Sequence, residues 1–348
     1  MKNEIIIYGK LPPPYGGVSI HLKRFKKYLE DSKKNFVFLQ LNNSYRKHMF
    51  RRLFFSQINF QKNIIHLHGF QTGKTLPFLL FLILFFNKKV IVTIHNDRFL
   101  LYYNSLKNIK KIIAKIFYSN ISHIISVNPD SKFGFIPDNK ISVIPAFIPP
   151  TSDETDIKKL PEFFYKIIQK HQFLITANAF KISFYKNQDL YGIDLSIELM
   201  KRLIDSGYKN IGFIYVIPDI GDYDYFEKMK NLVKKYNLEN NFHFYTKPIA
   251  YPAVINMCDL FIRPTNTDGD ALSIREAILL QKPAIASNVC KRPEGTILFR
   301  NRNIEDLYIK TTDVINNYEE YRAKIKSIEF EDNAEKILEV YKKVLNGK

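Results

Sequence analysis

The chain has 348 residues, 46% hydrophobic and 25% charged, a length and composition that exclude a disordered chain and favour two folded domains. The first 150 residues carry 23 basic and 6 acidic side chains, whereas the rest of the chain carries 29 and 28. This asymmetry indicates that the first half meets an anionic partner: nucleic acid, an anionic membrane surface or a phosphorylated substrate. General solubility of a Lys-rich chain is the alternative.

Cysteine usage and apolar runs narrow the class of protein further. Cys258 and Cys290 stand in apolar runs without metal-type spacing, which predicts reduced core residues of a cytosolic protein. The N-terminus lacks a cleavable hydrophobic segment, so we expect no signal peptide. The longest apolar run, residues 76–86, would be roughly 16 Å long as a helix at ~1.5 Å per residue. A bilayer core needs about 30 Å, so this run predicts a buried helix.

Short apolar segments alternate with helical patterns through the first half. After EIIIYG comes the loop LPPPYGG (11–17), which the prolines and glycines keep out of a helix. Residues 18–30 have helical periodicity. The later strand-like segments are FVFLQL, NIIHLHG, KVIVTIHN, SHIISVNP and KISVIPAF. Strands that alternate with helices predict a parallel sheet in an α/β domain.

The same pattern starts again after a linker-like stretch at residues 144–156. Strand and helix segments alternate from FLITANA (173–179) onward, and the tail from about residue 304 is charged and amphipathic. We therefore predict a second α/β domain. In such domains ligands bind at the carboxyl ends of the strands.

The glycine pair in the first loop is the first candidate site. Gly16 and Gly17 lie between a predicted strand and a predicted helix. Glycines there let backbone N–H groups approach a phosphate or a sugar at the helix N-terminus. An ordinary turn between a strand and a helix is the alternative.

Histidines close two of the predicted strands. His66 and His68 alternate onto one side of their strand, and His95 ends the next one. A neutral imidazole there can donate to a sugar hydroxyl or to a developing charge. Hydrogen-bonded core histidines are the alternative. A zinc site at His66 and His68 has no obvious third ligand, and we do not favour it.

Residues 263–277, RPTNTDGDALSIREA, crowd acids and bases before an apolar helical pattern. Ser273 and Glu276 fit a capping box. On the functional alternative, Glu276 accepts hydrogen bonds from a ribose, and N–H groups from Ala271 to Ser273 face phosphate oxygens. Asp268 and Asp270 also form a pair of the kind that binds Mg²⁺ or Mn²⁺, although residues 221–226 contain another such pair.

These segments, taken in order, resemble the retaining GT-B glycosyltransferases of family 4. The resemblance rests on PPPYGGVSIH, IIHLHG, TIHND, ISVNP, ISVIPAF, YGIDLSIELM, RPTNTDGDALSIREAILLQKPAIAS and PEGTILF. It implies an α/β fold of two Rossmann-like domains that face each other across a cleft. Residues 1–150 would bind the acceptor, residues 151–330 the nucleotide sugar, and a helix at 331–348 would return to the first domain.

The resemblance also assigns roles to residues. Glu276 would bind the donor ribose, Asp268 would face the donor sugar in place of the usual Glu, and His95 would lie beside the reacting sugar; these are the catalytic candidates. His21 and His68 would face the acceptor. The donor-binding candidates are Gly16, Gly17, Lys181, Lys186, Lys247, Pro248, Ile249, Asp270, Ala271, Leu272, Ser273 and Arg275.

The chain departs from the family pattern at the donor diphosphate. The family usually places an Arg and a Lys where this chain has Asn178 and Tyr191. Some cation is needed, because a site without a metal must neutralise the leaving diphosphate. The candidates are Lys181, Lys186, Arg263, Arg275 and Arg292.

We therefore expect a cytoplasmic retaining glycosyltransferase that needs no metal or other cofactor. It would move a sugar from a nucleotide sugar to a glycan acceptor, a lipid-linked pyrophosphoryl saccharide in cell-surface polysaccharide biosynthesis. Basic residues at 23–27, 46–52 and 107–111 would contact the anionic inner leaflet of the membrane. The alternatives are a GT-B nucleotide-sugar epimerase and a non-catalytic GT-B subunit. Nucleic acid is not an expected partner, because no known binding module is visible.

Overall fold

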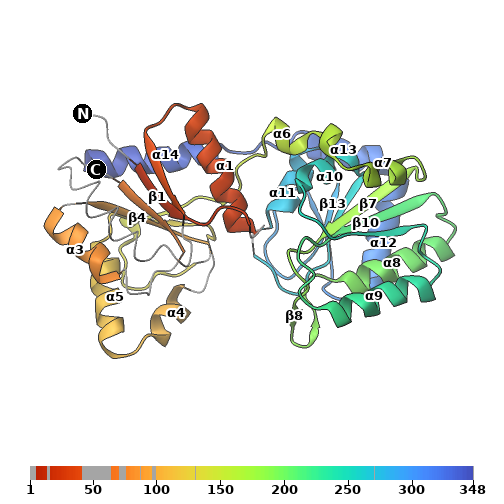
Figure 1. The fold of residues 1–348 in the computed structure, drawn as a ribbon, viewed down its shortest axis with the longest axis horizontal. Helices are drawn as coiled ribbons and strands as arrows, with labels where there is room; N and C mark the ends of the chain where they lie inside the picture. The colour runs from red at the N-terminus through yellow and green to blue at the C-terminus, as the bar shows by residue number, and fades with distance from the viewer. Residues whose placement is uncertain are drawn as a thin grey trace. The chain divides into compact units, whose positions relative to one another are not determined.

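The computed structural model describes residues 5–13, 16–40, 64–69, 76–86, 88–95, 99–129, 131–269 and 271–347. The chain divides into two compact units, residues 1–148 with 331–348, and residues 149–330. Each unit is an α/β structure built on one six-stranded sheet (Figure 1). The two sheets are parallel throughout. The predicted fold class is confirmed.

The first sheet has the strand order β2-β1-β3-β4-β5-β6, with a switch point between β1 and β3. Its strands are β1 (Ile5–Gly9), β2 (Phe36–Gln40), β3 (Ile64–His68), β4 (Lys89–Ile94), β5 (His123–Ser126) and β6 (Ile141–Val143). In the described parts of this unit, the helices are α1 (Gly17–Asp31), α3 (Leu76–Phe86), α4 (Phe99–Ser105), α5 (Asn108–Asn120), a short 3₁₀ turn (Asp138–Lys140) and α14 (Asn333–Asn346).

Helices cover both faces of the first sheet (Figure 1). On one face, Ile7, Ile64 and Ile91 pack against α1 and α14. On the other face, Ile65 and Val92 pack against α3, α4 and α5. Strands buried on both faces explain the unbroken apolar runs of the sequence.

The run at residues 76–86 is a helix, α3, as expected. Its burial is only partial: Leu79 lies in the core, whereas Phe81 and Leu84 are exposed. The prediction of a buried helix is therefore wrong for the side of α3 that carries Phe81 and Leu84. Within the described parts of the chain, we find no helix with the length and apolarity that a membrane crossing requires.

The second sheet has the order β11-β10-β7-β12-β13-β14, which is the strand order of the Rossmann fold. Its strands are β7 (Phe173–Asn178), β10 (Ile211–Val216), β11 (Phe242–Tyr245), β12 (Leu260–Arg263), β13 (Ala284–Ser287) and β14 (Thr296–Phe299). A separate hairpin joins β8 (Phe184–Tyr185) and β9 (Gln188–Asp189). The switch point lies between β7 and β12, so the carboxyl ends of these two strands mark the expected ligand site.

Two helical layers cover the second sheet (Figure 1). One face packs against α8 (Ile193–Asp205), α9 (Tyr223–Lys235) and α12 (Ile304–Asn316). The other packs against α7 (Glu162–Ile168), α10 (Tyr251–Met257) and α11 (Leu272–Leu279). The remaining elements are α6 (Ser152–Thr155), a 3₁₀ turn (Ile157–Lys159) and α13 (Tyr318–Lys326).

The cysteines differ from each other in burial. Cys258 is a core residue with a free thiol, as predicted. Cys290 is also reduced but only half-buried, so its assignment to the core is wrong. It lies in the loop after β13, where its thiol is 3.5 Å from the carbonyl oxygen of Gly269.

Candidate functional site

Asp268, in the acidic stretch after β12, is bound by two arginines. Its carboxylate accepts hydrogen bonds from Arg263 at 3.0 and 3.2 Å and from Arg292 at 2.9 Å. The Thr265 hydroxyl donates to it at 3.1 Å and the Gly269 N–H at 3.0 Å. The side chain of Asp268 is 11% exposed. The acid therefore has its partners within the protein itself.

Charge and burial act against each other at Asp268. Burial alone would raise the pKa of its carboxyl group, but the Arg263 and Arg292 guanidinium groups lower that pKa to about 2. Asp268 is therefore ionised at neutral pH. Two guanidinium groups face one carboxylate, which leaves one positive charge in excess within this group.

Arg263 links both positions at which the chain departs from the family pattern. It ends β12, and its guanidinium group donates to the carbonyl oxygen of Asn178 at 3.2 Å. The same guanidinium lies over the Tyr191 ring, 5.2 Å from the ring centre. Asn178 ends β7. The group formed by Arg263, Asn178, Tyr191 and Asp268 thus lies at the switch point of the second sheet.

Arg292 supports the same group from the loop after β13. Its side chain is only 2% exposed. Besides Asp268 it contacts the carbonyl oxygen of Ser287 at 3.0 Å and the Thr265 hydroxyl at 3.2 Å. A buried guanidinium with this many acceptors is held rigidly.

The helix after the acidic stretch, α11, begins at Leu272, and its N-cap Ala271 makes no side-chain hydrogen bond. Ser273 therefore lies inside the helix, and the capping-box interpretation of Ser273 and Glu276 is wrong. Both side chains are buried. The backbone N–H groups of Leu272 and Ser273, the first two of α11, have no intrahelical acceptor by helix geometry, whereas the N–H of Ile274 donates to the Ala271 carbonyl oxygen at 3.1 Å. Asp270 lies outside the described residues.

Other donor candidates surround this end of the second sheet. Lys181 is exposed and pairs with Asp219 at 3.8 Å, and Lys186 occupies the tip of the β8–β9 hairpin beside the Tyr185 ring. Among the described residues, neither lysine contacts Asp268. Arg275 is half-buried in α11.

The stretch that the resemblance assigns to the base follows β11. Lys247 and Pro248 are exposed, and Ile249 is half-buried against the cluster that includes α10. The three residues stand at the carboxyl end of a strand in the same sheet.

The glycine pair opens α1 in the first unit. Gly16 is the N-cap, and its N–H donates to the Ser19 hydroxyl at 3.0 Å, while that hydroxyl donates to the Gly16 carbonyl at 2.9 Å. A Cβ added to Gly16 or Gly17 would meet no atom of the described chain within 4 Å. Among the described residues, the fold does not demand glycine at these two positions, and no described atom fills the space beside the helix N-terminus.

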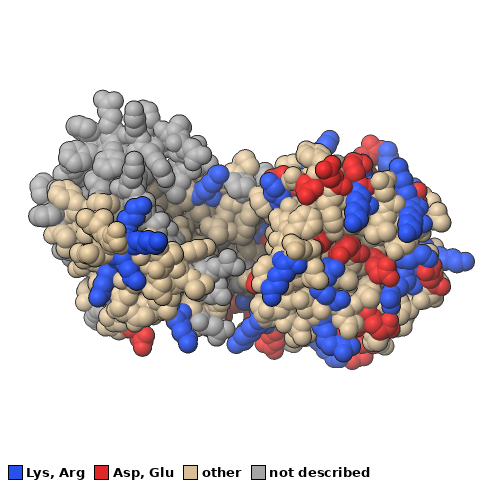
Figure 2. Space-filling model, turned by 90° about the horizontal axis from the view of Figure 1, so that it is seen from below, with Lys and Arg blue, Asp and Glu red and all other residues tan. Residues whose placement is uncertain are grey.

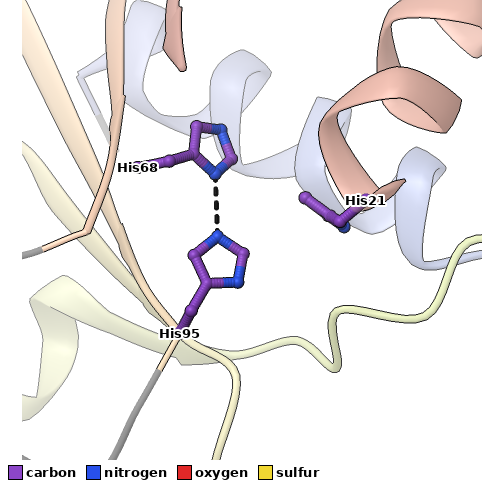
Figure 3. Close-up of side chains that lie close together, drawn as sticks. All are labelled: His21, His68 and His95. Atoms are coloured by element: carbon purple, nitrogen blue, oxygen red, sulfur yellow. Dashed lines mark hydrogen bonds between the residues drawn. The ribbon is translucent and has the colours of Figure 1, made fainter. Parts of the chain in front are cut away.

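Three of the predicted histidines converge in the first unit (Figure 3). His68 ends β3, and its Nδ1 lies 2.9 Å from Nε2 of His95, which follows β4. His21, from α1, places its ring centre 5.5 Å from that of His68 and 5.3 Å from that of His95. Its Nδ1 is 2.7 Å from the Ala146 carbonyl oxygen.

His66 belongs to the core and not to this cluster. Its ring is 4.3 Å from that of His68, which confirms that the two lie on one side of the strand. Its Nδ1 bonds the Tyr341 hydroxyl at 2.5 Å, and its Nε2 bonds the Thr93 hydroxyl at 2.7 Å. The alternative of a hydrogen-bonded core histidine is confirmed for His66.

Burial keeps these imidazoles neutral. Desolvation lowers the pKa of His21 to about 4 and that of His66 to about 3. Burial, followed by the neighbouring imidazoles, lowers the pKa values of His68 and His95 well below their ordinary value. At pH 7 the cluster can therefore accept or donate hydrogen bonds without a net charge.

The basic segments predicted to face a membrane differ in their surroundings. In the segment 23–27, Arg24 is buried and donates to the Ile148 carbonyl at 3.1 Å, and Lys26 and Lys27 pair with acids one turn later in α1. Residues 46–52 lie outside the described parts. The segment 107–111 leads into α5, where Ile109, Ile112 and Ile116 are exposed beside the lysines.

Sequence reasoning missed two features of these groups. It named Arg263 and Arg292 only as possible phosphate-binding cations and did not place them on Asp268. It also rejected a metal at His68 for want of a third ligand, whereas His21 and His95 both lie beside His68. One signal for His21 was available in the sequence. His21 lies four residues after Gly17, about one helical turn into the helix that follows the first strand, which places it near the carboxyl ends of the strands.

The second unit matches a family model described as "Glycosyl transferases group 1" over residues 168–330. Protein CapJ of Staphylococcus aureus is 30% identical over 178 residues, which cover 45% of this chain and 43% of CapJ. The chain therefore matches less than half of the length of this relative.

Solved structures resemble the whole chain. HepE from Anabaena, crystallised with UDP, is 15% identical with a TM-score of 0.65, and the match covers 99% of both chains. A glycosyltransferase from Rickettsia africae is 16% identical with a TM-score of 0.67 over all of both chains. Identities this low establish the fold alone, which is the GT-B fold of two Rossmann-like units.

Proposed function

We propose that this chain, whose second unit is a group 1 glycosyl transferase domain, transfers a sugar from a nucleotide sugar to a glycan acceptor. The observation that carries the proposal is the group of Arg263, Asn178, Tyr191 and Asp268 at the switch point of the second sheet. Ligands of open α/β sheets bind at this place. The UDP complex of HepE supports a nucleoside diphosphate as the ligand class.

Arg263 is the proposed cation for the donor diphosphate. The family pattern places its Arg and Lys at the positions of Asn178 and Tyr191, and Arg263 contacts both of these residues. A guanidinium group that reaches this point from β12 can supply the charge that the two substitutions remove. Arg292 supplies the second positive charge, and Asp268 holds both guanidinium groups in place until the diphosphate arrives.

The remaining donor roles follow from the resemblance and stay proposals. Glu276 accepts from the ribose hydroxyls, the first N–H groups of α11 face the diphosphate, and residues 247–249 flank the base. Gly16 and Gly17 leave room for the donor at α1. His95 lies by the reacting sugar, and His21 and His68 face the acceptor. Lys181, Lys186 and Arg275 are secondary candidates for the phosphate charge.

In the proposed reaction, the bond between the anomeric carbon and the diphosphate oxygen breaks, and a bond to an acceptor hydroxyl oxygen forms with retention of configuration. The departing diphosphate oxygen keeps the electron pair of the broken bond, and the acceptor hydroxyl passes its proton to that oxygen as the new bond forms. The protein contributes position and the stabilisation of the negative charge that develops on the leaving diphosphate. The excess positive charge of Arg263 and Arg292 is suited to that purpose without a metal ion.

The acceptor is proposed to be lipid-linked at an anionic membrane surface. α5 carries three lysines and no acid, and Ile109, Ile112 and Ile116 on one side of it are 69, 60 and 42% exposed. This combination of apolar and basic side chains is typical of helices that bind membrane interfaces. The visible face of the first unit in Figure 2 shows mostly basic charges among uncharged side chains, whereas that of the second unit mixes both signs.

Product analysis tests the transfer and separates it from the alternatives. The chain is incubated with nucleotide sugars labelled in the sugar, with and without a lipid extract that contains glycan acceptors. We expect the metal-free chain to place label in a glycan product and to release the nucleoside diphosphate, unchanged by EDTA. A new sugar nucleotide formed without acceptor would instead identify an epimerase. No turnover of any donor would favour a non-catalytic subunit, in which Arg263 and Asp268 only neutralise each other.

A further inference from the structure

Three imidazoles from three different elements of the first unit form a group with the spacing of metal ligands (Figure 3). His21 comes from α1, His68 from the end of β3, and His95 from the residue after β4. One ring nitrogen of each can be chosen so that all three nitrogens lie within 4.8 Å of one another. The group lies at the carboxyl ends of the strands of the first sheet.

His21 is oriented as metal-binding histidines are. Its Nδ1 lies 2.7 Å from the Ala146 carbonyl oxygen, which can only accept, so Nδ1 carries the proton and Nε2 carries a lone pair. That Nε2 is buried and makes no hydrogen bond within the described residues, in a side chain that is 1% exposed. Ligating histidines usually donate their other N–H to a carbonyl in this way, which fixes the tautomer and the ring.

His68 and His95 already bring two nitrogens together. Their Nδ1 and Nε2 atoms are 2.9 Å apart. Ligand nitrogens at ~2.0–2.1 Å from a tetrahedral ion lie ~3.3 Å from each other. A small rotation of the two rings would therefore admit an ion. His66 is not a further ligand, because both of its nitrogens are bonded, to Tyr341 and to Thr93.

We propose that His21, His68 and His95 bind one divalent transition-metal ion of the class that prefers imidazole nitrogen, with Zn²⁺ as the representative. The three ligands are all nitrogen, a set that suits Zn²⁺, Cu²⁺ or Ni²⁺ and not Mg²⁺ or Ca²⁺. His95 is only half-buried, which leaves a fourth position for water or another exchangeable ligand. The buried guanidinium of Arg24 near His21 opposes a bound cation and weakens the affinity.

Binding of the ion does not depend on the proposed function, but its consequence does. If sugar transfer holds, the ion takes the nitrogens proposed to face the acceptor and the reacting sugar. The loaded chain would then transfer sugar more slowly, and a chelator would restore the rate. This site would be inhibitory, in contrast to a metal that assists departure of the diphosphate.

The test measures metal binding on the full chain without nucleotide or acceptor. After treatment with a chelator and its removal, Zn²⁺ is titrated by calorimetry, and Co²⁺ is added to a second sample to record its visible spectrum. His21→Ala and His95→Ala remove ligands one at a time. His123→Gln is the matched control, because His123 is a buried histidine of the same sheet that bonds Ser142 away from the cluster.

We expect one Zn²⁺ per chain and the intense visible bands of four-coordinate Co²⁺. His21→Ala and His95→Ala should each bind Zn²⁺ at least about tenfold more weakly, because the loss of even an indirect partner of a metal site lowers metal affinity by about that factor. His123→Gln should bind Zn²⁺ like the parent. The proposal is overturned if the parent binds no stoichiometric Zn²⁺ or if both ligand variants bind like the parent. Should a variant fail to fold, a weak six-coordinate Co²⁺ spectrum of the parent would overturn it as well. None of these results bears on donor binding by the second unit.

Discussion

Asp268 shows how one residue could serve both the fold and the proposed diphosphate site. A carboxylate beside a diphosphate site repels the ligand, yet two buried guanidinium groups without any partner would be costly to the fold. Asp268 compensates one of the two positive charges and orients both Arg263 and Arg292. The charge that remains is available to an incoming ligand, and its donors need little rearrangement.

The depressed pKa of Asp268 makes its contribution to stability depend on pH. Its pKa of about 2 in the folded chain lies below the ordinary value of about 3.9. The stabilisation, about 2 kcal/mol, is therefore present in full above pH 4 and is lost as the pH falls toward 2. We expect Asp268→Asn to lower the thermal midpoint of the second unit at pH 7, and this deficit to shrink as the pH falls below 4.

Thermal unfolding of both proteins between about pH 1.5 and about pH 7 provides the check, because this range brackets the folded and the unfolded pKa of Asp268. Asp224→Asn is a control, because Asp224 is an exposed acid of the same unit, in the first turn of α9. A deficit that stays constant across this range would contradict an ionised, arginine-bound Asp268.

The proposed role of Arg263 leads to a rescue experiment. We expect Arg263→Gln to weaken nucleoside diphosphate binding by about 10- to 100-fold, because a hydrogen bond to a charged group contributes ~1.5–3 kcal/mol. Asn178→Arg, added to that variant, should restore much of the affinity, because it returns an arginine to the position that the family pattern uses. Isothermal titration calorimetry measures both.

Arg302→Gln is the matched control for this experiment. Arg302 also binds an aspartate of the second unit, Asp194, with two hydrogen bonds, but it belongs to the loop before α12. It should leave nucleotide binding unchanged. Equal losses in Arg263→Gln and Arg302→Gln would mean that the effect is one of stability, and no loss in either would remove Arg263 from the donor site.

At the scale of elements, a substitution at the N-terminus of α1 should affect donor binding and stability differently. A methyl group at Gly17 meets no described atom within 4 Å, and alanine is the better helix former by ~0.5–1 kcal/mol. We therefore expect Gly17→Ala to keep or slightly raise the thermal midpoint while it weakens donor binding or transfer. Calorimetry with the nucleotide sugar and a thermal scan provide the two readings.

Gly192→Ala should have the opposite effect on stability to Gly17→Ala. Gly192 has a φ of 68°, and a Cβ there would lie 2.4 Å from the carbonyl oxygen of Pro264. The change should lower stability because the fold itself requires glycine at this position. If Gly17→Ala lost stability and kept full donor binding, the proposed role of the α1 N-terminus would be wrong.

The exposed side of α5 makes a prediction about membranes. Ile112→Asp and Ile116→Asp should each reduce flotation of the chain with anionic vesicles at low salt, because they remove apolar contact and add repulsion. Ile309→Asp is the control: Ile309 is 51% exposed on α12 of the second unit. No flotation of the parent chain, or the same loss for all three variants, would rule out this face as the membrane contact.

At the scale of the whole molecule, the sequence was sufficient to predict the architecture. Apolar runs ended by Gly, Pro or polar residues marked the strands because parallel strands are buried on both faces. The alternation with helical periodicity then predicted two Rossmann-like units, which is confirmed. Periodicity described α3 less well, because an all-apolar run carries no sign of which side faces the solvent.

The site was harder to predict than the fold, for a physical reason. Arg263 contacts Asn178, which lies 85 positions earlier in the chain. His21 likewise lies tens of positions before the other two histidines of its cluster. No local pattern reports such contacts. The start of α11 also escaped prediction: Ser273 has the right spacing for a capping box, but the helix begins one residue earlier, at Leu272.

Binding of a nucleotide sugar by the second unit is the central claim, and a thermal-shift panel tests it most directly. Nucleoside diphosphates and sugar nucleotides are added to the parent chain and to Arg263→Gln, with and without EDTA. A ligand at a hundredfold excess over its Kd stabilises the folded state by about 2.7 kcal/mol. We expect one sugar nucleotide to stabilise the parent, with no effect of EDTA and a much smaller shift for Arg263→Gln. If no nucleotide stabilises the parent chain, the central claim is wrong.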